Sequence, residues 1–408
     1  MTPATAAPIG FALLLPLLLA AQPVATDSYL SALPAIATEL GSASTSLTMF
    51  VLTFGVAQIP VGSLADRIGR RPVLLGGLAL YVVAALAGAL AASAAMLAGV
   101  RAVQGAAMAA ILVCSRAAVR DLYPAHEGMH VMARGLTGLG VVALIAPVLG
   151  AFVVQWAGWR WVLVLMAVYG AVLLAMCWHS FGETQAPQAA GQPAAQGGVR
   201  EVFASRSFRV WSCLSASSYG GIFCFLLLSP MVYIGYLGLP PALYGWIPSF
   251  GSAIYIGSTT ACRRLLYRWG PLRTVRLGAL LSISGALIQA LGAWHLPGSA
   301  WPLMLGHAFF SMGHGIHQPC GQAGAVGDLP RLAGRAVSWS GFMMMAVAFC
   351  VGQLASRFID ERHSHGAWPM VVPMLAAGSA IVLIAFVWLP RVLAHQQQLQ
   401  HKPKEKTT

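Results

Sequence analysis

The chain has 408 residues, of which 58% are hydrophobic and only 9% are charged. No soluble globular protein can hide so much apolar surface around so few charges, so the composition excludes that class and predicts an integral membrane protein. The formal net charge of +13 would suggest a nucleic acid partner in a soluble protein, but the placement of the basic residues argues against one here.

A membrane-spanning helix needs about 20 predominantly apolar residues, and twelve segments of the chain have that character. In chain order they are 9–33, 47–64, 73–92, 96–119, 131–156, 161–181, 210–237, 244–266, 274–294, 301–319, 337–358 and 368–389. The sequence therefore predicts an all-α membrane protein with twelve transmembrane helices.

The basic residues fall mostly on one side of the predicted membrane. If the N-terminus lies in the cytoplasm, the inside loops and the tail hold twenty of the 24 lysines and arginines. The outside loops hold Arg160, Arg357 and Arg362, and Arg101 alone lies within a span. This asymmetry predicts a multi-pass protein of the bacterial inner membrane with both termini in the cytoplasm.

A change in composition divides the spans six and six. Between Glu183 and Glu201 the chain turns to Ala, Gln, Gly and Pro, which cannot bury apolar area and predict a mobile linker. We expect an N-terminal six-helix half at 1–182, a cytoplasmic linker at 183–206, a C-terminal six-helix half at 207–394 and a disordered cytoplasmic tail at 395–408.

Asp27 is an acidic residue late in the first span, four residues after Pro23. A carboxylate inside a membrane costs several kcal/mol unless it faces a cavity or a partner, so it indicates function. Burial disfavours its charged form and a nearby cation favours it, which suits a group that couples transport to protons. The alternative is that the span ends earlier and that Asp27 is an interfacial cap in contact with the periplasm.

The loop between spans two and three, residues 62–72, reads Gly-Ser-Leu-Ala-Asp-Arg-Ile-Gly-Arg-Arg-Pro. Glycines permit close helix approach, an aspartate can face a helix N-terminus, and arginines seek carboxylates. We predict a conformational latch composed of Gly62, Asp66, Arg67, Gly69, Arg70, Arg71 and Asp121. The alternative is that the arginines only set the topology.

This loop resembles the signature between helices 2 and 3 of the major facilitator superfamily. At an offset of 201 residues, Gly69 corresponds to Gly270 and Arg67 to Arg268, although Tyr267 stands where an aspartate would be. The resemblance implies two pseudo-symmetric six-helix halves, arranged as parallel repeats about an axis normal to the membrane.

Arg101 is the one basic residue within a span, and Gln104 and Gly105 follow it in a pattern that resembles helix 4 of the superfamily. A buried guanidinium needs a carboxylate, carbonyls or a water-filled cavity. We expect Asp27 to be its electrostatic partner, directly or through substrate and water. The alternative is that Arg101 extends outward to the near membrane surface.

The fifth span is rich in glycine and carries Pro147 and Gly150. A proline removes one helix hydrogen bond, and small residues let helices approach each other. The run resembles the helix 5 motif of antiporters in the superfamily, although Ala146 replaces the usual glycine. Ordinary packing by small residues is the alternative.

Further segments resemble the drug:proton antiporters of the bicyclomycin and chloramphenicol resistance type. They are Asp27 to Pro34, Tyr219 to Phe223, Ser229-Pro230, Gly313 to Pro319, and Ala333 to Ala336. The resemblance covers almost the whole chain. It implies that Asp27 is the titrating aspartate of helix 1 and that Arg101 is the arginine of helix 4.

Two histidines of span ten, His314 and His317, share a helix face by their spacing. They are candidates for proton handling or substrate hydrogen bonding, or they are polar packing groups, and no metal site is predicted. Aromatic and methionine surfaces accept varied ligands. The predicted substrate cavity comprises Tyr29, Met49, Gln58, Gln104, Tyr219, Phe223, Tyr233, Tyr255, His314, His317 and Met343.

Together these features predict proton-coupled efflux of small amphipathic drugs or toxic compounds by alternating access. The expected partners are substrate, protons and membrane lipid, with no cofactor and with a monomer as the working unit. The main alternative is a proton symporter that imports a nutrient. No hydrolase or metalloprotease motif occurs, so we do not expect an enzyme.

Overall fold

The computed structural model describes residues 9–123, 125–184, 198–329, 332–356 and 366–394. Helices fill most of these ranges, and no β-strand occurs within them. This confirms the predicted all-α class. The predicted tail at 395–408 and most of the predicted linker lie outside the described residues.

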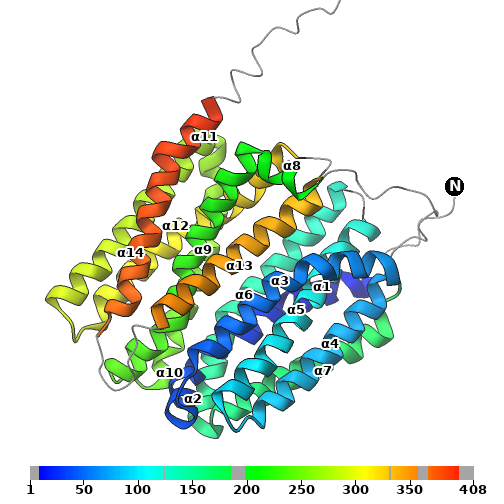
Figure 1. Ribbon diagram of the computed structural model, residues 1–408, viewed down its shortest axis with the longest axis horizontal. Helices are drawn as coiled ribbons and strands as arrows, with labels where there is room; N and C mark the ends of the chain where they lie inside the picture. The colour runs from blue at the N-terminus through cyan, green and yellow to red at the C-terminus, as the bar shows by residue number, and fades with distance from the viewer. Residues whose placement is uncertain (1–8, 124, 185–197, 330–331, 357–365, 395–408) are drawn as a thin grey trace, which may run out of the picture. The chain divides into compact units, whose positions relative to one another are not determined.

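The helices are shown in chain order by their colours (Figure 1). Before the linker they are α1 (Ile9–Thr26), the 3₁₀ turn η1 (Leu30–Ala32), α2 (Leu33–Leu40), α3 (Ser44–Ile68), α4 (Arg70–Ala89), α5 (Ala94–Leu122), α6 (Ala125–Ala157) and α7 (Trp159–Ser180). After it come α8 (Val199–Ala204), α9 (Arg206–Pro230), the π-helical η2 (Met231–Tyr236), α10 (Pro241–Tyr244), α11 (Trp246–His295), α12 (Ala300–Gly327), α13 (Ala333–Ser356), α14 (Trp368–Leu383) and the π-helical η4 (Ile384–Trp388).

Ten helical stretches among the described residues are long and apolar enough to cross a membrane. One of them, Pro241–His295, has 55 residues and contains a non-helical residue, Gly270, so its length serves two crossings. The helix α12 is not among the ten, but its 28 residues are long enough for a further span. The arrangement is therefore consistent with twelve transmembrane helices.

Contacts group the chain into two compact units. The first comprises Met1–Gln192, Phe223–Ala253 and Ala348–Met370, and the second comprises Pro193–Ile222, Ile254–Val347 and Val371–Thr408. The predicted domain ranges stay a prediction, because this grouping joins parts of both predicted halves in the first unit. Within the predicted linker the described residues form the short helix α8.

Small residues set the packing of the first unit, where α5 lies against both α3 and α4. Gly105 of α5 meets the backbone of α3 so closely that a Cβ atom would overlap the Phe50 carbonyl oxygen. The Thr53 hydroxyl of α3 donates to the Ala102 carbonyl of α5 at 2.6 Å. Close approach of two helix backbones at small residues is the packing expected in a membrane.

The first predicted span is not one continuous helix. The helix α1 ends at Thr26, and a turn at Asp27–Tyr29 precedes η1 and α2. Two side chains before and within the turn bond to backbone carbonyls, Thr26 to Gln22 at 3.0 Å and Ser28 to Val24 at 2.5 Å. Such bonds compete with the helical pattern, and Pro34 has no N–H to give to the Leu30 carbonyl. The break therefore falls at Asp27.

The two loops that the sequence relates by an offset of 201 have similar backbones. Gly69, between α3 and α4, has φ 100° and ψ 159°. Gly270, inside α11, has φ 71° and ψ 175°. Both conformations lie in the positive φ region that side chains disfavour, which explains why glycine occupies both positions. The degraded copy thus keeps the turn of the first loop.

We expect the substitution Gly105→Ala to lower the thermal stability of the full-length protein in detergent, because overpacking costs about 1–3 kcal/mol. Gly99→Ala, on the same helix, is the matched control, since a Cβ atom there meets nothing within 4 Å. Thermal unfolding followed by fluorescence compares the two variants. Equal midpoints for both variants would contradict the close approach of α3 and α5.

Candidate functional site

The polar centre of the first unit is Arg101 of α5, whose side chain is only 1% exposed. Its guanidinium donates to the Gln104 Oε1 at 2.6 Å, one turn along the same helix, and to the Ala25 carbonyl oxygen at 2.9 Å. Ala25 lies in the last turn of α1, where helix carbonyls lack intrahelical partners. Arg101 thus caps the C-terminus of α1, and a cation is favourable at that end of the helix dipole.

Two aromatic rings complete the surroundings of this guanidinium. The Arg101 Cζ atom lies 4.4 Å from the centroid of the Tyr29 ring and 4.4 Å from that of Phe50. The Tyr29 hydroxyl is hydrogen-bonded to the Ser46 hydroxyl at 2.8 Å, which fixes the ring. Contact with aromatic faces is worth about 2 kcal/mol or more where the cation is desolvated. The positive charge of Arg101 is therefore stabilised by a backbone carbonyl, a side-chain amide and two aromatic rings.

Asp27 lies two residues beyond the carbonyl that Arg101 binds. No ion pair between Asp27 and Arg101 occurs in the part of the chain described, so the direct form of the expected pairing is not present. The Asp27 carboxylate is partly exposed and accepts a hydrogen bond from the Thr26 hydroxyl at 2.7 Å. It sits at the C-terminal end of α1, where the helix dipole disfavours a negative charge. The Thr26 hydrogen bond opposes that effect.

A tyrosine from a later segment lies near this carboxylate. Tyr244 of α10 is buried, is within electrostatic range of Asp27, and shares a 2.8 Å hydrogen bond with the Ser229 hydroxyl. An acid, a cation and hydroxyl groups thus gather around the break in the first span. Such a site can hold a proton or release it, depending on which of its neighbours are solvated.

The glycine of the fifth span lies against the same break, and its proline lies near Gly245. At Gly150 of α6 a Cβ atom would overlap the Ser28 carbonyl oxygen. Near Pro147, a Cβ atom on Gly245 would come within 2.9 Å of the Pro147 carbonyl oxygen. Pro147 and Gly150 thus place α6 between the turn beside Asp27 and the start of α11. This close packing is what the small residues in the motif permit.

The predicted cavity residues divide between the two units. The first unit contains Tyr29, Met49, Gln58, Gln104, Phe223 and Tyr233, and the second contains Tyr219, Tyr255, His314, His317 and Met343. In the first unit, Tyr29 and Gln104 meet at the Arg101 guanidinium, and Tyr233 is buried beside the Tyr244 ring at a centroid distance of 6.2 Å. A single cavity formed by all eleven residues stays a prediction.

The two predicted histidines of α12 have different surroundings. His314 shares a 2.9 Å hydrogen bond between Nδ1 and the Ser218 hydroxyl, and its ring lies 5.3 Å from Tyr255 and 6.3 Å from Tyr219. His317 is fully buried, and its Nε2 is 3.3 Å from the Val275 carbonyl oxygen. A contact between a buried histidine and a backbone carbonyl is typical of a packing role, which stays a prediction for His317. His314, among hydroxyl and aromatic groups, is the better candidate for substrate contact.

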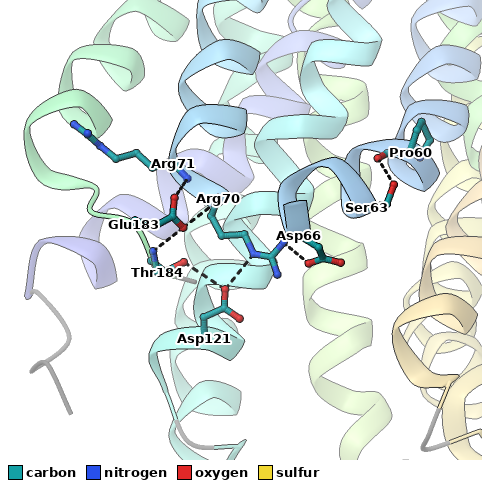
Figure 2. Close-up of polar contacts among 8 residues, drawn as sticks. All are labelled: Pro60, Ser63, Asp66, Arg70, Arg71, Asp121, Glu183 and Thr184. Atoms are coloured by element: carbon teal, nitrogen blue, oxygen red, sulfur yellow. Dashed lines mark hydrogen bonds and ion pairs between the residues drawn. The ribbon is translucent and has the colours of Figure 1, made fainter. Parts of the chain in front are cut away.

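The first loop forms a charged cluster at the ends of α3, α4, α5 and α7 (Figure 2). Arg70 is 4% exposed and pairs with Asp66 at 2.6 Å and with Asp121 at 3.1 Å. Arg71 donates to the Trp178 carbonyl oxygen at 3.0 Å. One arginine thus joins the end of α3 to the end of α5.

A carboxylate from beyond α7 completes this cluster. The Glu183 side chain accepts hydrogen bonds from the backbone N–H groups of Arg70 at 2.9 Å and Arg71 at 3.1 Å (Figure 2). Those groups open α4 and have no intrahelical acceptors. Gly69 has no side chain to cap them, and a Cβ atom at Gly69 would collide with the Glu183 carboxylate. Glu183 therefore replaces the missing N-cap and complements the helix dipole.

Sequence reasoning missed Glu183 and Thr184, which were assigned to the start of the mobile linker. Thr184 donates from its hydroxyl to Asp121 at 3.4 Å, so the chain is anchored through this residue. One feature of the sequence could have indicated this contact. Glu183 is an acidic residue that follows the sixth predicted span, on the same side of the membrane as the arginine-rich loop.

Two predicted latch residues are not held by the cluster. Arg67 is exposed and forms no ion pair with a residue that the structure describes. Gly62 faces open space, because a Cβ atom there meets nothing within 4 Å, so it is not a point of close helix approach. The positive-inside pattern explains Arg67 without a specific contact.

Comparisons with known proteins place this geometry in context. The Major Facilitator Superfamily matches residues 17–353. A chloramphenicol resistance protein of Pseudomonas aeruginosa is 29% identical over 390 residues, covering 92% of this chain and 89% of the relative. A bicyclomycin resistance protein homolog of Haemophilus influenzae is 25% identical over 392 residues, covering 93% of this chain and 96% of the relative.

A solved structure has a similar fold at low sequence identity. It is a bacterial homolog of the human lysosomal transporter Spinster in an inward-facing, occupied conformation. It superposes with a TM-score of 0.74 at 16% identity and covers 95% of this chain and 97% of the solved chain. This likeness supports the fold and leaves substrate and mechanism open.

We expect Arg101→Lys to lower the thermal midpoint of the purified protein. A lysine has one ammonium group, which cannot hold the Ala25 carbonyl and Gln104 in the fork geometry of arginine, and a lost buried hydrogen bond costs about 1–3 kcal/mol. Arg160→Lys is the matched control, because Arg160 pairs with Glu39 at the surface. If the control melts as early as Arg101→Lys, the capping role is wrong.

We expect Glu183→Gln to destabilise the first unit by about 0.5–1 kcal/mol, and Glu183→Ala by up to about 2 kcal/mol, because the N-terminus of α4 loses its charge partner and then its acceptors. Hydrogen exchange at the α4 amides is the direct measurement. Glu201→Gln, an exposed carboxylate in α8, should leave that exchange unchanged. Unchanged protection in both Glu183 variants would refute the cap.

Proposed function

The chain belongs to the Major Facilitator Superfamily, and from that premise we propose that it exports small amphipathic drugs or toxic compounds in exchange for protons. The names of its relatives support this proposal, because they are a chloramphenicol resistance protein and a bicyclomycin resistance protein homolog. Alternating access then carries substrate outward and protons inward, with no cofactor.

The observation that carries the proposal is the position of the Asp27 carboxylate at the break in the first span. It is partly exposed, bonded to Thr26, and held near the C-terminus of α1, whose carbonyls are bound by Arg101. The helix dipole opposes the negative charge, and the hydrogen bond from Thr26 favours it. Such a balance lets a modest change in solvation move a proton on or off the carboxylate.

In the proposed cycle a proton from outside neutralises Asp27. The transporter then opens inward, and substrate binding favours release of the proton to the cytoplasm. Return to the outward-open state releases the substrate. Coupling requires that the site favour either proton or substrate, but not both together, and this exclusion is a coupling free energy between the two ligands.

The proposal includes the orientation, location and working unit. The surplus of basic residues in alternate loops supports cytoplasmic termini and the bacterial inner membrane. The cluster around Arg70 then lies at the cytoplasmic surface, where it acts as a conformational latch whose ion pairs break and reform during the cycle. We propose that the monomer is sufficient for transport, because each chain carries its own Asp27 and Arg101.

Asp27→Asn is expected to abolish proton-driven efflux, because the amide cannot exchange a proton, while leaving substrate exchange between equal pools intact. Proteoliposomes loaded with a fluorescent or radiolabelled drug, with an imposed pH gradient, measure both activities. Glu201→Gln is the control, since it removes a carboxylate far from α1 in sequence and should transport normally. Full gradient-driven efflux by Asp27→Asn would overturn the assignment.

The direction of proton movement separates the proposal from nutrient import. Antiport predicts that substrate added on the cytoplasmic face is exchanged for protons from the opposite side. These protons are released on the side to which the substrate was added. Symport predicts co-movement, which appears as alkalinisation outside intact cells when substrate is added. An alkaline response would show that the protein imports substrate and does not export it. The proposed role of Asp27 in proton coupling would be unaffected.

A further inference from the structure

A groove in the second unit lies beside the loop that copies the first one. It has a volume of about 440 Å³ and is lined by Trp269, Arg273, Arg276, Leu277, Leu280 and Phe386. The residues come from α11 on both sides of Gly270 and from the π-helical segment η4. Nothing in the proposed transport cycle uses these residues.

The two arginines of this groove lack the carboxylates that the first loop provides. In the first loop, Arg70 pairs with Asp66 and Asp121, and Glu183 covers the N-terminus of α4. In the second loop, Tyr267 stands in the position of Asp66. Neither Arg273 nor Arg276 forms an ion pair with any residue within the described ranges. The helix that starts after Gly270 thus presents positive charge and an N-terminal dipole without an ion-paired carboxylate among the described residues.

Arg276 is positioned but incompletely bonded. Its guanidinium lies over the Phe386 ring at 5.0 Å from the ring centroid, and its Nε atom is buried without a hydrogen-bond partner. A buried donor with no acceptor is less favourable than a satisfied one. An anion in the groove would be attracted by this guanidinium, because the Arg276 side chain lines the groove.

The groove changes from charged to apolar along one helix face. Arg273, Arg276, Leu277 and Leu280 recur at spacings of three and four residues, so they share a face of α11. Seven residues of helix rise about 10 Å, which carries the lining from guanidinium groups to leucine side chains. Trp269 and Leu280 are about half exposed, at 48% and 52%, on a helix that crosses the membrane.

We propose that this groove binds an anionic phospholipid, with the phosphodiester headgroup on Arg273 and Arg276 and one acyl chain along Leu277, Leu280 and Phe386. Charge complementarity selects the headgroup, and the apolar end of the groove selects a lipid over a free anion. Trp269 is next to Gly270, between the two predicted crossings of α11, and tryptophans at the ends of spans anchor helices to the membrane surface. Basic pockets between membrane helices are known to hold acidic headgroups.

The test compares lipids on the purified full-length protein. Dioleoyl phosphatidylglycerol and dioleoyl phosphatidylcholine have the same acyl chains, so only the headgroup charge differs, and glycerol phosphate provides the headgroup chemistry without chains. We expect phosphatidylglycerol to raise the thermal midpoint more than phosphatidylcholine and to remain bound in native mass spectrometry. Glycerol phosphate at the same concentration should do neither.

The double variant Arg273→Gln/Arg276→Gln should bind phosphatidylglycerol at least roughly tenfold more weakly, because each arginine near the membrane surface contributes to anionic lipid binding. The matched control is Arg263→Gln/Arg264→Gln, which removes the same charge from exposed positions of α11 before Gly270. It should keep the preference for phosphatidylglycerol. If the double variant does not fold, Arg276→Gln alone replaces it.

Three results would overturn the proposal. Equal stabilisation by the two lipids would remove the headgroup preference. Equal loss in the control and the groove variant would show that only overall charge matters. Displacement of phosphatidylglycerol by glycerol phosphate at equal concentration would identify a site for small anions in place of a lipid.

Discussion

The contact on which the first unit depends is the hydrogen bond from Arg101 to the Ala25 carbonyl oxygen. A break in a membrane helix leaves carbonyls without partners, and no water replaces them in the hydrocarbon core. Arg101 fills this need and is itself held between Tyr29 and Phe50. One buried cation thus makes it possible for the first span to turn at Asp27. The acid therefore lies in a turn and not within a continuous helix.

The charged cluster around Arg70 follows the same principle at the membrane surface. There the unsatisfied groups are the N–H groups of α4, and the carboxylate of Glu183 satisfies them. In both places the backbone end of a helix is completed by a side chain distant in sequence. The side-chain contacts at Arg101 and Glu183 are therefore made at helix ends. Along the helix faces, close packing at small residues such as Gly105 joins the helices.

Composition and hydropathy were sufficient to predict the class and the spans, because a membrane helix needs little more than length and apolar content. The site was predicted less completely. The sequence singled out Asp27, Arg101 and Arg70. It indicated an earlier end of the first span only as an alternative, because apolar residues resume at Leu30. Nor did it find Glu183, because composition alone assigned that residue to the linker. Partners across more than a hundred residues depend on tertiary packing, which one sequence does not encode in any local pattern.

The bond between Glu183 and α4 spans 113 residues of the chain. Because a polypeptide emerges from the ribosome in order, α4 enters the bilayer long before its capping acid has been translated. Two amides at its start therefore stay hydrated at the aqueous face until the last helix of the first six is in place. Arrival of Glu183 completes the cap of α4 before the later spans have been synthesised in full.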